Sequence, residues 1–114
     1  MRLTRLAMVA AFLLIAGVSA FTAVKSVTAA APAGPTVRID NFTFSPPEIT
    51  IASGTAVTWE NRDDIPHEVV AADKAFRSKV LDTDESYSFT FTSPGVYEYF
   101  CALHPHMKGK VIVK

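Results

Sequence analysis

Ser86-Tyr87-Ser88-Phe89-Thr90-Phe91 alternates polar and apolar residues over six consecutive positions. This period of two is typical of a β-strand with one buried face, because successive side chains of a strand point to opposite sides. Alternation or a run of β-branched and aromatic residues also occurs at residues 36–40, 48–51, 56–60, 96–100 and 110–114. No long helical period and no internal repeat accompany these stretches, so the sequence predicts an all-β domain.

Turn-forming residues separate the predicted strands, at Pro46-Pro47, Ser53-Gly54, Asp63-Asp64 and Ser93-Pro94-Gly95. Short strands at this spacing predict either two packed antiparallel sheets or a small barrel. Only residues 71–81 lack clear alternation, and we expect a helical turn or an irregular loop there. The expected core consists of the apolar strand residues Val37, Ile39, Ile49, Ile51, Val57, Trp59, Tyr87, Phe89, Phe91, Val111 and Val113.

The first 30 residues have the features of an export signal. Arg2 and Arg5 precede an uncharged apolar run at residues 6–21, and small-x-small cleavage sites follow at residues 18–20 and 27–29. The run is short for a membrane span, which needs about 20 residues, so we expect cleavage, with an uncleaved membrane anchor as the alternative. Both outcomes predict a location outside the cytoplasm, in the periplasm. Residues 31–35 then form a short tether and residues 36–114 a single domain.

The charge distribution changes when the leader is considered separately. The whole chain has eleven basic and eleven acidic residues, but Arg2, Arg5 and Lys25 lie in the leader and every acidic residue lies from Asp40 onward. The remaining domain has eight basic and eleven acidic residues, a net charge of about −3. Nucleic-acid binding depends on clustered Lys and Arg, so it is excluded. A domain of about 80 residues also excludes a two-domain enzyme.

Three soft or borderline metal donors follow one another near the C-terminus. Cys101, His104 and Met107 are spaced three residues apart in Phe100-Cys101-Ala102-Leu103-His104-Pro105-His106-Met107-Lys108-Gly109. A thiolate, an imidazole and a thioether suit copper, which binds in a trigonal plane of two His and one Cys with a weak axial Met. The second His must come from another segment, and His67, stiffened by the preceding Pro66, is the candidate outside the loop. Cys101 is the single Cys, so it forms no internal disulfide.

Two segments resemble those of the cupredoxins, the small blue copper proteins. The first runs from Val96 through the compact ligand loop to Val111, and it is similar to the loop of the amicyanin-type, plastocyanin-like members. The second is Trp59-Glu60-Asn61-Arg62-Asp63-Asp64-Ile65-Pro66-His67. The resemblance covers residues 36–114 and implies a Greek-key β-sandwich with one copper ion at one end. It also implies that His67, Cys101 and His104 form the copper plane, that Met107 is the axial ligand, and that the function is one-electron transfer between larger redox proteins.

This sequence departs from the family pattern at three positions. Glu68 stands where relatives commonly have Asn, and Ala102 where they often have Ser or Thr. In those relatives the two side chains tie the ligand segments together, so we expect that link to be absent, with backbone N–H groups left to contact the Cys101 sulfur. His106 stands where amicyanin-type members have an aromatic residue. It is either an exposed imidazole or a residue that modulates partner docking or replaces Met107 or His104 in one redox state.

The resemblance also implies where electrons leave the domain. His104 would reach the surface within a small apolar patch formed by Leu103, Pro105, Ile65 and Pro66, which suits a transient partner. The expected partners are a c-type cytochrome, a periplasmic dehydrogenase or both. We expect the protein to be a monomer, and to associate with a membrane only if the leader stays uncleaved. Asp63 and Asp64 either steer a basic partner or form a solvated turn.

Two other functional classes compete with electron transfer. A copper enzyme needs a second metal centre with several more His, whereas only His106 remains after His67 and His104. A nucleophilic dyad of Cys101 and His104 lacks any motif that orients the His or provides an oxyanion hole. We therefore expect no enzyme. The main alternative is a copper carrier that delivers the metal, although carriers tend to have open or Met-rich sites and Met107 is the one Met outside the leader.

Overall fold

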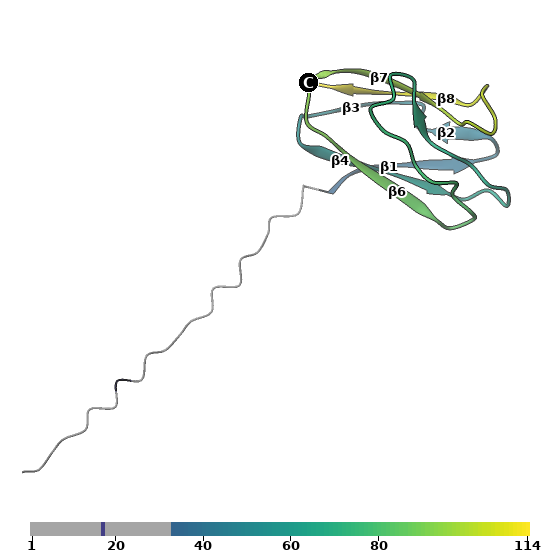
Figure 1. Cartoon of the computed structure of the whole chain (residues 1–114), viewed down its shortest axis with the longest axis horizontal. Helices are drawn as coiled ribbons and strands as arrows, with labels where there is room; N and C mark the ends of the chain where they lie inside the picture. Colours follow the sequence, from purple (N-terminus) through teal and green to yellow (C-terminus); the bar gives the residue numbers. More distant parts are fainter. Residues whose placement is uncertain (1–16, 18–32) are drawn as a thin grey trace, which may run out of the picture.

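The computed structural model describes Gly17 and residues 33–114, and the rest of the predicted signal segment lies outside the described residues. Two sheets pack face to face (Figure 1), and both are formed by the described part of the chain, which contains no helix. Their strands are β1 (Ala33–Asp40), β2 (Thr43–Ser45), β3 (Glu48–Ile51), β4 (Thr55–Asn61), β5 (Val70–Ala71), β6 (Ser86–Phe91), β7 (Gly95–Phe100) and β8 (Lys108–Val113). The predicted all-β sandwich is confirmed, and no helix among the described residues could span a membrane.

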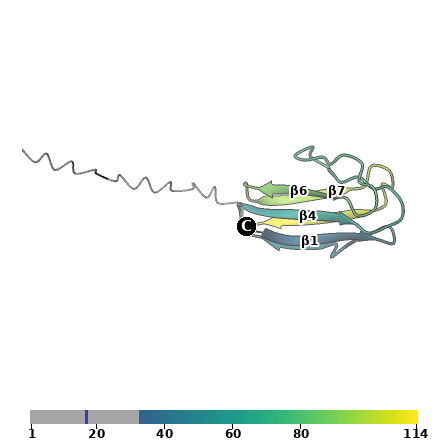
Figure 2. The ribbon, with the colours of Figure 1, turned by 90° about the horizontal axis from the view of Figure 1, so that it is seen from below.

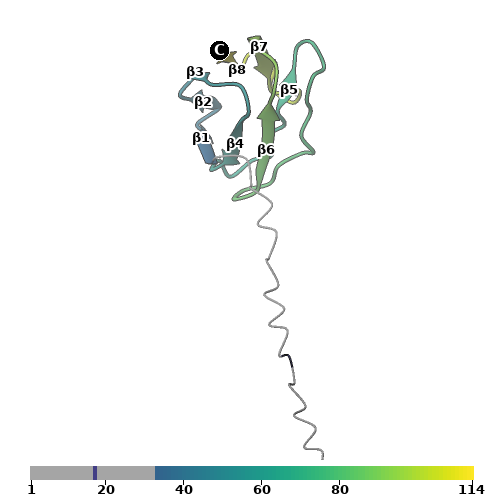
Figure 3. The same ribbon diagram turned by 90° about the vertical axis from the view of Figure 1, so that its left-hand side faces the viewer.

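The sheets are mixed, so the prediction of two antiparallel sheets was wrong in this respect. One sheet has the order β2-β1-β4-β6 and the other the order β3-β8-β7-β5, and an end-on view separates the two layers (Figure 3). β1 and β4 are parallel, as are β3 and β8, whereas the other pairs are antiparallel. The parallel pairs arise because the chain changes sheets at Pro46-Pro47, and the turn after β3 then returns β4 in the direction of β1.

Several strand boundaries differ from the sequence expectations. β1 begins at Ala33, within the predicted tether, and pairs with β4 through a bulge. β2 was not predicted; it pairs with β1 after a tight turn in which Asn41 and Phe42 both have positive φ, 49° and 56°. β5 is a strand of only two residues, and isolated bridges join His67 to Leu81 and Val70 to Arg77 beside it. Residues 72–81 form an irregular loop, which is one of the two structures expected there, and not a helical turn.

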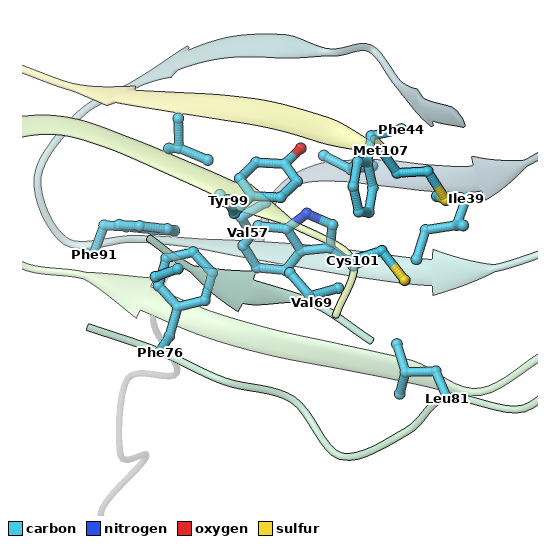
Figure 4. Packing of buried hydrophobic residues seen from close by; sticks show 14 of the residues in the cluster. Ile39, Phe44, Val57, Val69, Phe76, Leu81, Phe91, Tyr99, Cys101 and Met107 are labelled. Carbon is cyan, nitrogen blue, oxygen red and sulfur yellow. The ribbon is translucent and has the colours of Figure 1, made fainter. Parts of the chain in front are cut away.

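The core lies between the two sheets (Figure 4), and Trp59 is one of its fully buried residues. The Trp59 ring lies 5.3–6.3 Å from the rings of four other aromatic residues, Phe76, Tyr87, Phe91 and Tyr99. Eight of the eleven predicted core residues belong to the buried cluster, and the other three, Ile49, Tyr87 and Phe89, are partly buried and pack against it. Sequence reasoning missed the buried residues Phe44, Val69, Ala71, Phe76, Leu81 and Tyr99.

Three connections meet at the end of the sandwich opposite the C-terminus (Figures 1 and 2). They are the β1–β2 turn, the long connection between β4 and β6, and the β7–β8 loop. The long connection is held in place by backbone hydrogen bonds, including His67 N–H to Leu81 O at 3.0 Å and Leu81 N–H to His67 O at 2.7 Å. The fold therefore brings the two segments that carry the predicted metal donors to one edge of the core.

Candidate metal centre

The β7–β8 loop positions its donors through a chain of backbone hydrogen bonds. The N–H of His104 donates to Cys101 O at 3.1 Å, and the N–H of Met107 donates to His104 O at 2.9 Å. The N–H of Cys101 donates to Met107 O at 3.1 Å and closes the loop. The hydrogen bonds thus join the same three residues that the sequence spacing singles out. A loop closed in this way holds its side chains in place before any ion binds.

His67 comes from the connection after β4 and completes the donor group. His67 and Cys101 are both fully buried, and the Nδ1 atom of His67 lies 3.7 Å from the Cys101 Sγ. The Nδ1 atom of His104 lies 3.8 Å from the same sulfur. All three donor atoms lie within 4.8 Å of one another. The structure thus brings together the three residues that sequence reasoning chose from two distant segments.

These separations fit a single metal ion. Typical bonds from a metal to a His nitrogen are about 2.0 Å and to a Cys sulfur about 2.3 Å. In a trigonal plane those bonds place the nitrogen and the sulfur about 3.7 Å apart. The observed distances of 3.7 and 3.8 Å match that value. One thiolate and two imidazoles are the donors of a type 1 copper plane, so the site is suited to copper.

Met107 lies beside this group. Its side chain is buried, and its sulfur and that of Cys101 lie at the same end of the core (Figure 4). A thioether beside a His–Cys–His plane is the weak axial ligand that copper sites of this type use. The placement agrees with the role expected for Met107.

The Cys101 sulfur accepts a backbone hydrogen bond from the other ligand segment. The N–H of Glu68 lies 3.3 Å from Cys101 Sγ, as expected for a backbone contact to the sulfur. The Glu68 side chain accepts a hydrogen bond from Arg77 Nε at 2.6 Å. This residue therefore joins three segments: its N–H reaches the β7–β8 loop, and its carboxylate holds the irregular loop before β6.

Asp63 differs from the sequence expectation. The sequence predicts either a solvated turn residue or a charge that steers a partner, but Asp63 is buried, and its carboxylate lies 2.7 Å from His67 Nε2. Its oxygens also accept the N–H of Asn41 at 2.6 Å and of Phe42 at 3.0 Å. Burial by itself raises the pKa of Asp63, but hydrogen bonds from Phe42, His67 and Asn41 outweigh it and leave the pKa below its usual value. Asp64 remains exposed.

An exposed apolar surface adjoins the donor group. His104 is partly exposed, and Leu103, which sequence reasoning placed here, is 48% exposed. Sequence reasoning missed Phe42, which is 51% exposed. The Phe42 ring meets those of His67 and His104 edge-on, with centroids 5.8 and 5.1 Å away. His106 is exposed beside this surface.

The fold and the donor group are those of a small copper protein. A family model described as a cupredoxin-like domain matches residues 6–113, so the chain belongs to the cupredoxin family. Within that family its sequence resembles the amicyanins. It is 38% identical over 112 residues to amicyanin-alpha from Methylorubrum extorquens, covering 87% of this chain and 94% of that protein. It is 40% identical over 83 residues to amicyanin from Paracoccus versutus, covering 68% of this chain and 63% of that protein.

Comparison with solved structures also finds amicyanins and other cupredoxins. An oxidised amicyanin variant matches with a TM-score of 0.69 at 34% identity, covering 75% of this chain and 86% of that one. A purple cupredoxin from Nitrosopumilus maritimus matches with a TM-score of 0.68 at 32% identity, covering 71% of this chain and 100% of that one. The cupredoxin fold and the similarity to amicyanin that the ligand loop predicted are confirmed.

Proposed function

We propose that this protein is a periplasmic one-electron carrier with one type 1 copper ion, bound by His67, Cys101 and His104 in a plane and by Met107 as axial ligand. The observation that carries this proposal is the pair of N–S separations, 3.7 and 3.8 Å, at a buried cysteine shared by two histidines. When bound, copper at such a site supplies a centre that alternates between Cu(II) and Cu(I).

The rigidity of the donor segments supports electron transfer. His67 is held by two backbone hydrogen bonds to Leu81, and the ligand loop is closed by three of its own. Donors that cannot move far keep one geometry for both oxidation states, which lowers the cost of reorganisation when an electron passes. The same arrangement argues against the delivery of copper to another protein, because a buried thiolate between two held imidazoles does not open easily.

The partly exposed His104 is the proposed exit for the electron. Leu103 and Phe42 surround it with apolar surface, and a small apolar surface suits a short-lived complex. The proposed partners are redox proteins, a c-type cytochrome or a periplasmic dehydrogenase, because the relatives are amicyanins and plastocyanins. The same relatives support a carrier without enzymatic activity.

A Cu(II) titration of the protein from Ala31 onward, followed by visible absorption, tests this proposal. We expect an intense charge-transfer band that saturates at one copper per chain and is bleached reversibly by ascorbate. Cys101→Ser should abolish the band, whereas His106→Phe, which changes an exposed residue near the donors, should retain it. A pale protein with weak absorption would refute a Cys-ligated copper. Loss of copper on reduction would favour metal delivery.

A further inference from the structure

The proposed function leaves one buried charge near the donors without a role. Asp63 is 8% exposed, and both its side-chain oxygens and its backbone groups are engaged. Its N–H donates to Asn61 Oδ1 at 2.9 Å, and its carbonyl accepts from the Thr83 hydroxyl at 2.6 Å. A carboxylate held from both sides in this way has a fixed position relative to His67.

The contact with His67 determines which ring nitrogen carries the proton. An ionised carboxylate only accepts hydrogen bonds, so His67 must donate from Nε2, which lies 2.7 Å from Asp63 Oδ2. In a neutral imidazole the other nitrogen, Nδ1, then keeps a free lone pair. That is the nitrogen 3.7 Å from Cys101 Sγ. Asp63 therefore selects the tautomer in which His67 presents its free lone pair on the Cys101 side.

The charge of Asp63 is not cancelled by a neighbouring Lys or Arg. Within residues 33–114, its single ion-pair partner is His67 itself, while Arg62 pairs with Glu60 and Asp84. The other buried carboxylate beside the donors, Glu68, is paired with Arg77. Asp63 is thus the uncompensated buried anion next to a metal donor, and an anion stabilises the more positive oxidation state of a metal.

We propose that Asp63 is a positioning residue for the metal: it orients His67, favours Cu(II) over Cu(I), and so holds the reduction potential down. This inference rests on the proposed function. The same carboxylate accepts the N–H groups of Asn41 and Phe42, so it also fixes the turn that places Phe42 against both donor histidines. One acidic side chain joins the β1–β2 turn to the metal site.

Asp63→Asn tests the proposal with little change in shape. In the unmodified protein Asp63 Oδ1 accepts the Asn41 N–H, and Oδ2 accepts from Phe42 and His67. An amide has only one acceptor oxygen, so Asn cannot accept all three hydrogen bonds. Outer-shell partners of metal ligands typically contribute 10- to 100-fold in affinity. We therefore expect Cu(II) affinity to fall about tenfold relative to Cu(I) affinity, which raises the one-electron potential by about 59 mV. Voltammetry of the copper-loaded protein measures this shift.

Matched variants separate positioning from a general effect of charge or stability. Asp64→Asn removes the same charge from the exposed neighbouring residue, and salt screening should keep the change in the affinity ratio below about twofold. Asp63→Glu keeps the charge, so its reduction potential should lie closer to that of the unmodified protein than the potential of Asp63→Asn does. A purely structural role would lower the melting temperature of Asp63→Asn and leave the potential unchanged. Equal shifts in Asp63→Asn and Asp64→Asn would overturn the proposal.

Nitrogen-15 NMR of histidine side chains tests the contact in the unmodified protein, even if Asp63→Asn fails to fold. In the copper-free protein we expect a His67 proton on Nε2, shifted downfield and protected from exchange with water. Exposed His106 provides the internal comparison. A His67 protonated on Nδ1 alone, or one whose Nε2 proton exchanges as fast as that of His106, would overturn the proposal. Because this measurement needs no copper, a failed copper titration of the unmodified protein would refute the proposed function separately.

Discussion

Gly109 provides the sharpest test of how the sandwich is packed next to the ligand loop. It lies on β8 directly opposite Tyr99 on β7, and the Tyr99 ring covers the position that a side chain would occupy. A Cβ atom at Gly109 would lie 2.6 Å from Tyr99 Cε2, and closer still to Cζ and Oη. Carbon atoms normally approach to about 3.5–4.0 Å, so Gly109→Ala requires the ring or the strand to move.

The surroundings of Tyr99 make that movement costly. Its ring is 1% exposed and is packed between Trp59, at 5.3 Å, and Phe44, at 4.8 Å between centroids. Overpacking of a well-filled core costs about 1–3 kcal/mol, and the severity of this overlap points to the upper end. Ala gains about 0.5–1 kcal/mol over Gly through its lower conformational freedom in the unfolded chain. We therefore expect Gly109→Ala to destabilise the protein by about 2 kcal/mol, a fall in Tm of about 8–16 °C.

Thermal and urea unfolding followed by circular dichroism measure this effect. A double-mutant cycle with Tyr99→Leu identifies the cause, because contacting residues couple and independent ones add. In the Tyr99→Leu background, Gly109→Ala should be neutral or stabilising by up to about 1 kcal/mol, since the ring that it would overlap is gone. An equal cost in both backgrounds, or a loss below about 0.5 kcal/mol in the unmodified protein, would refute the packing argument.

Three further variants test other parts of the structure. Cys101→Ser should remove the intense visible band and weaken Cu(II) binding, measured by absorption titration, because oxygen replaces the thiolate that gives the charge transfer. Phe76→Ala should cost about 3–5 kcal/mol in urea unfolding, since this ring lies 5.4 Å from that of Trp59; a cost below about 1 kcal/mol would mean that the irregular loop adds little to the core. Burial raises the pKa of Tyr99 to about 12, so the folded state keeps the proton that the unfolded chain loses near pH 10. Tyr99 should therefore contribute a fall in stability of about 1.4 kcal/mol per pH unit between pH 10 and 12, and Tyr99→Phe, compared by urea unfolding across this range, should reduce the slope by that amount.

Strands and donors were predictable where the signal is local. The alternation at residues 86–91 appears unchanged as β6, and the three-residue spacing of Cys101, His104 and Met107 matches the hydrogen bonds that close the ligand loop. His67 could be chosen by elimination, because the chain offers few histidines. These features depend on residue type and on neighbours along the chain.

Other features had no local signal. Phe76 and Leu81 lie in a loop without a hydrophobic period, and they are buried because the loop folds over the open side of the core. Phe42 adjoins both donor histidines only because the β1–β2 turn lies at the same end of the sandwich. An acidic pair beside Pro66 resembles an ordinary solvated turn, so the burial of Asp63 was not predicted.

The sequence by itself determined the class of fold and the chemical identity of the metal donors, because strand periodicity and ligand softness belong to residue types. Only the tertiary structure decided which groups surround those donors. Asp63 contacts His67 only four residues along the chain, but its carboxylate is held by the β1–β2 turn, where the N–H groups of Asn41 and Phe42 donate to it from 22 and 21 residues away. Such contacts depend on the path of the backbone in space, and for that reason the tuning of the site is a property of the fold.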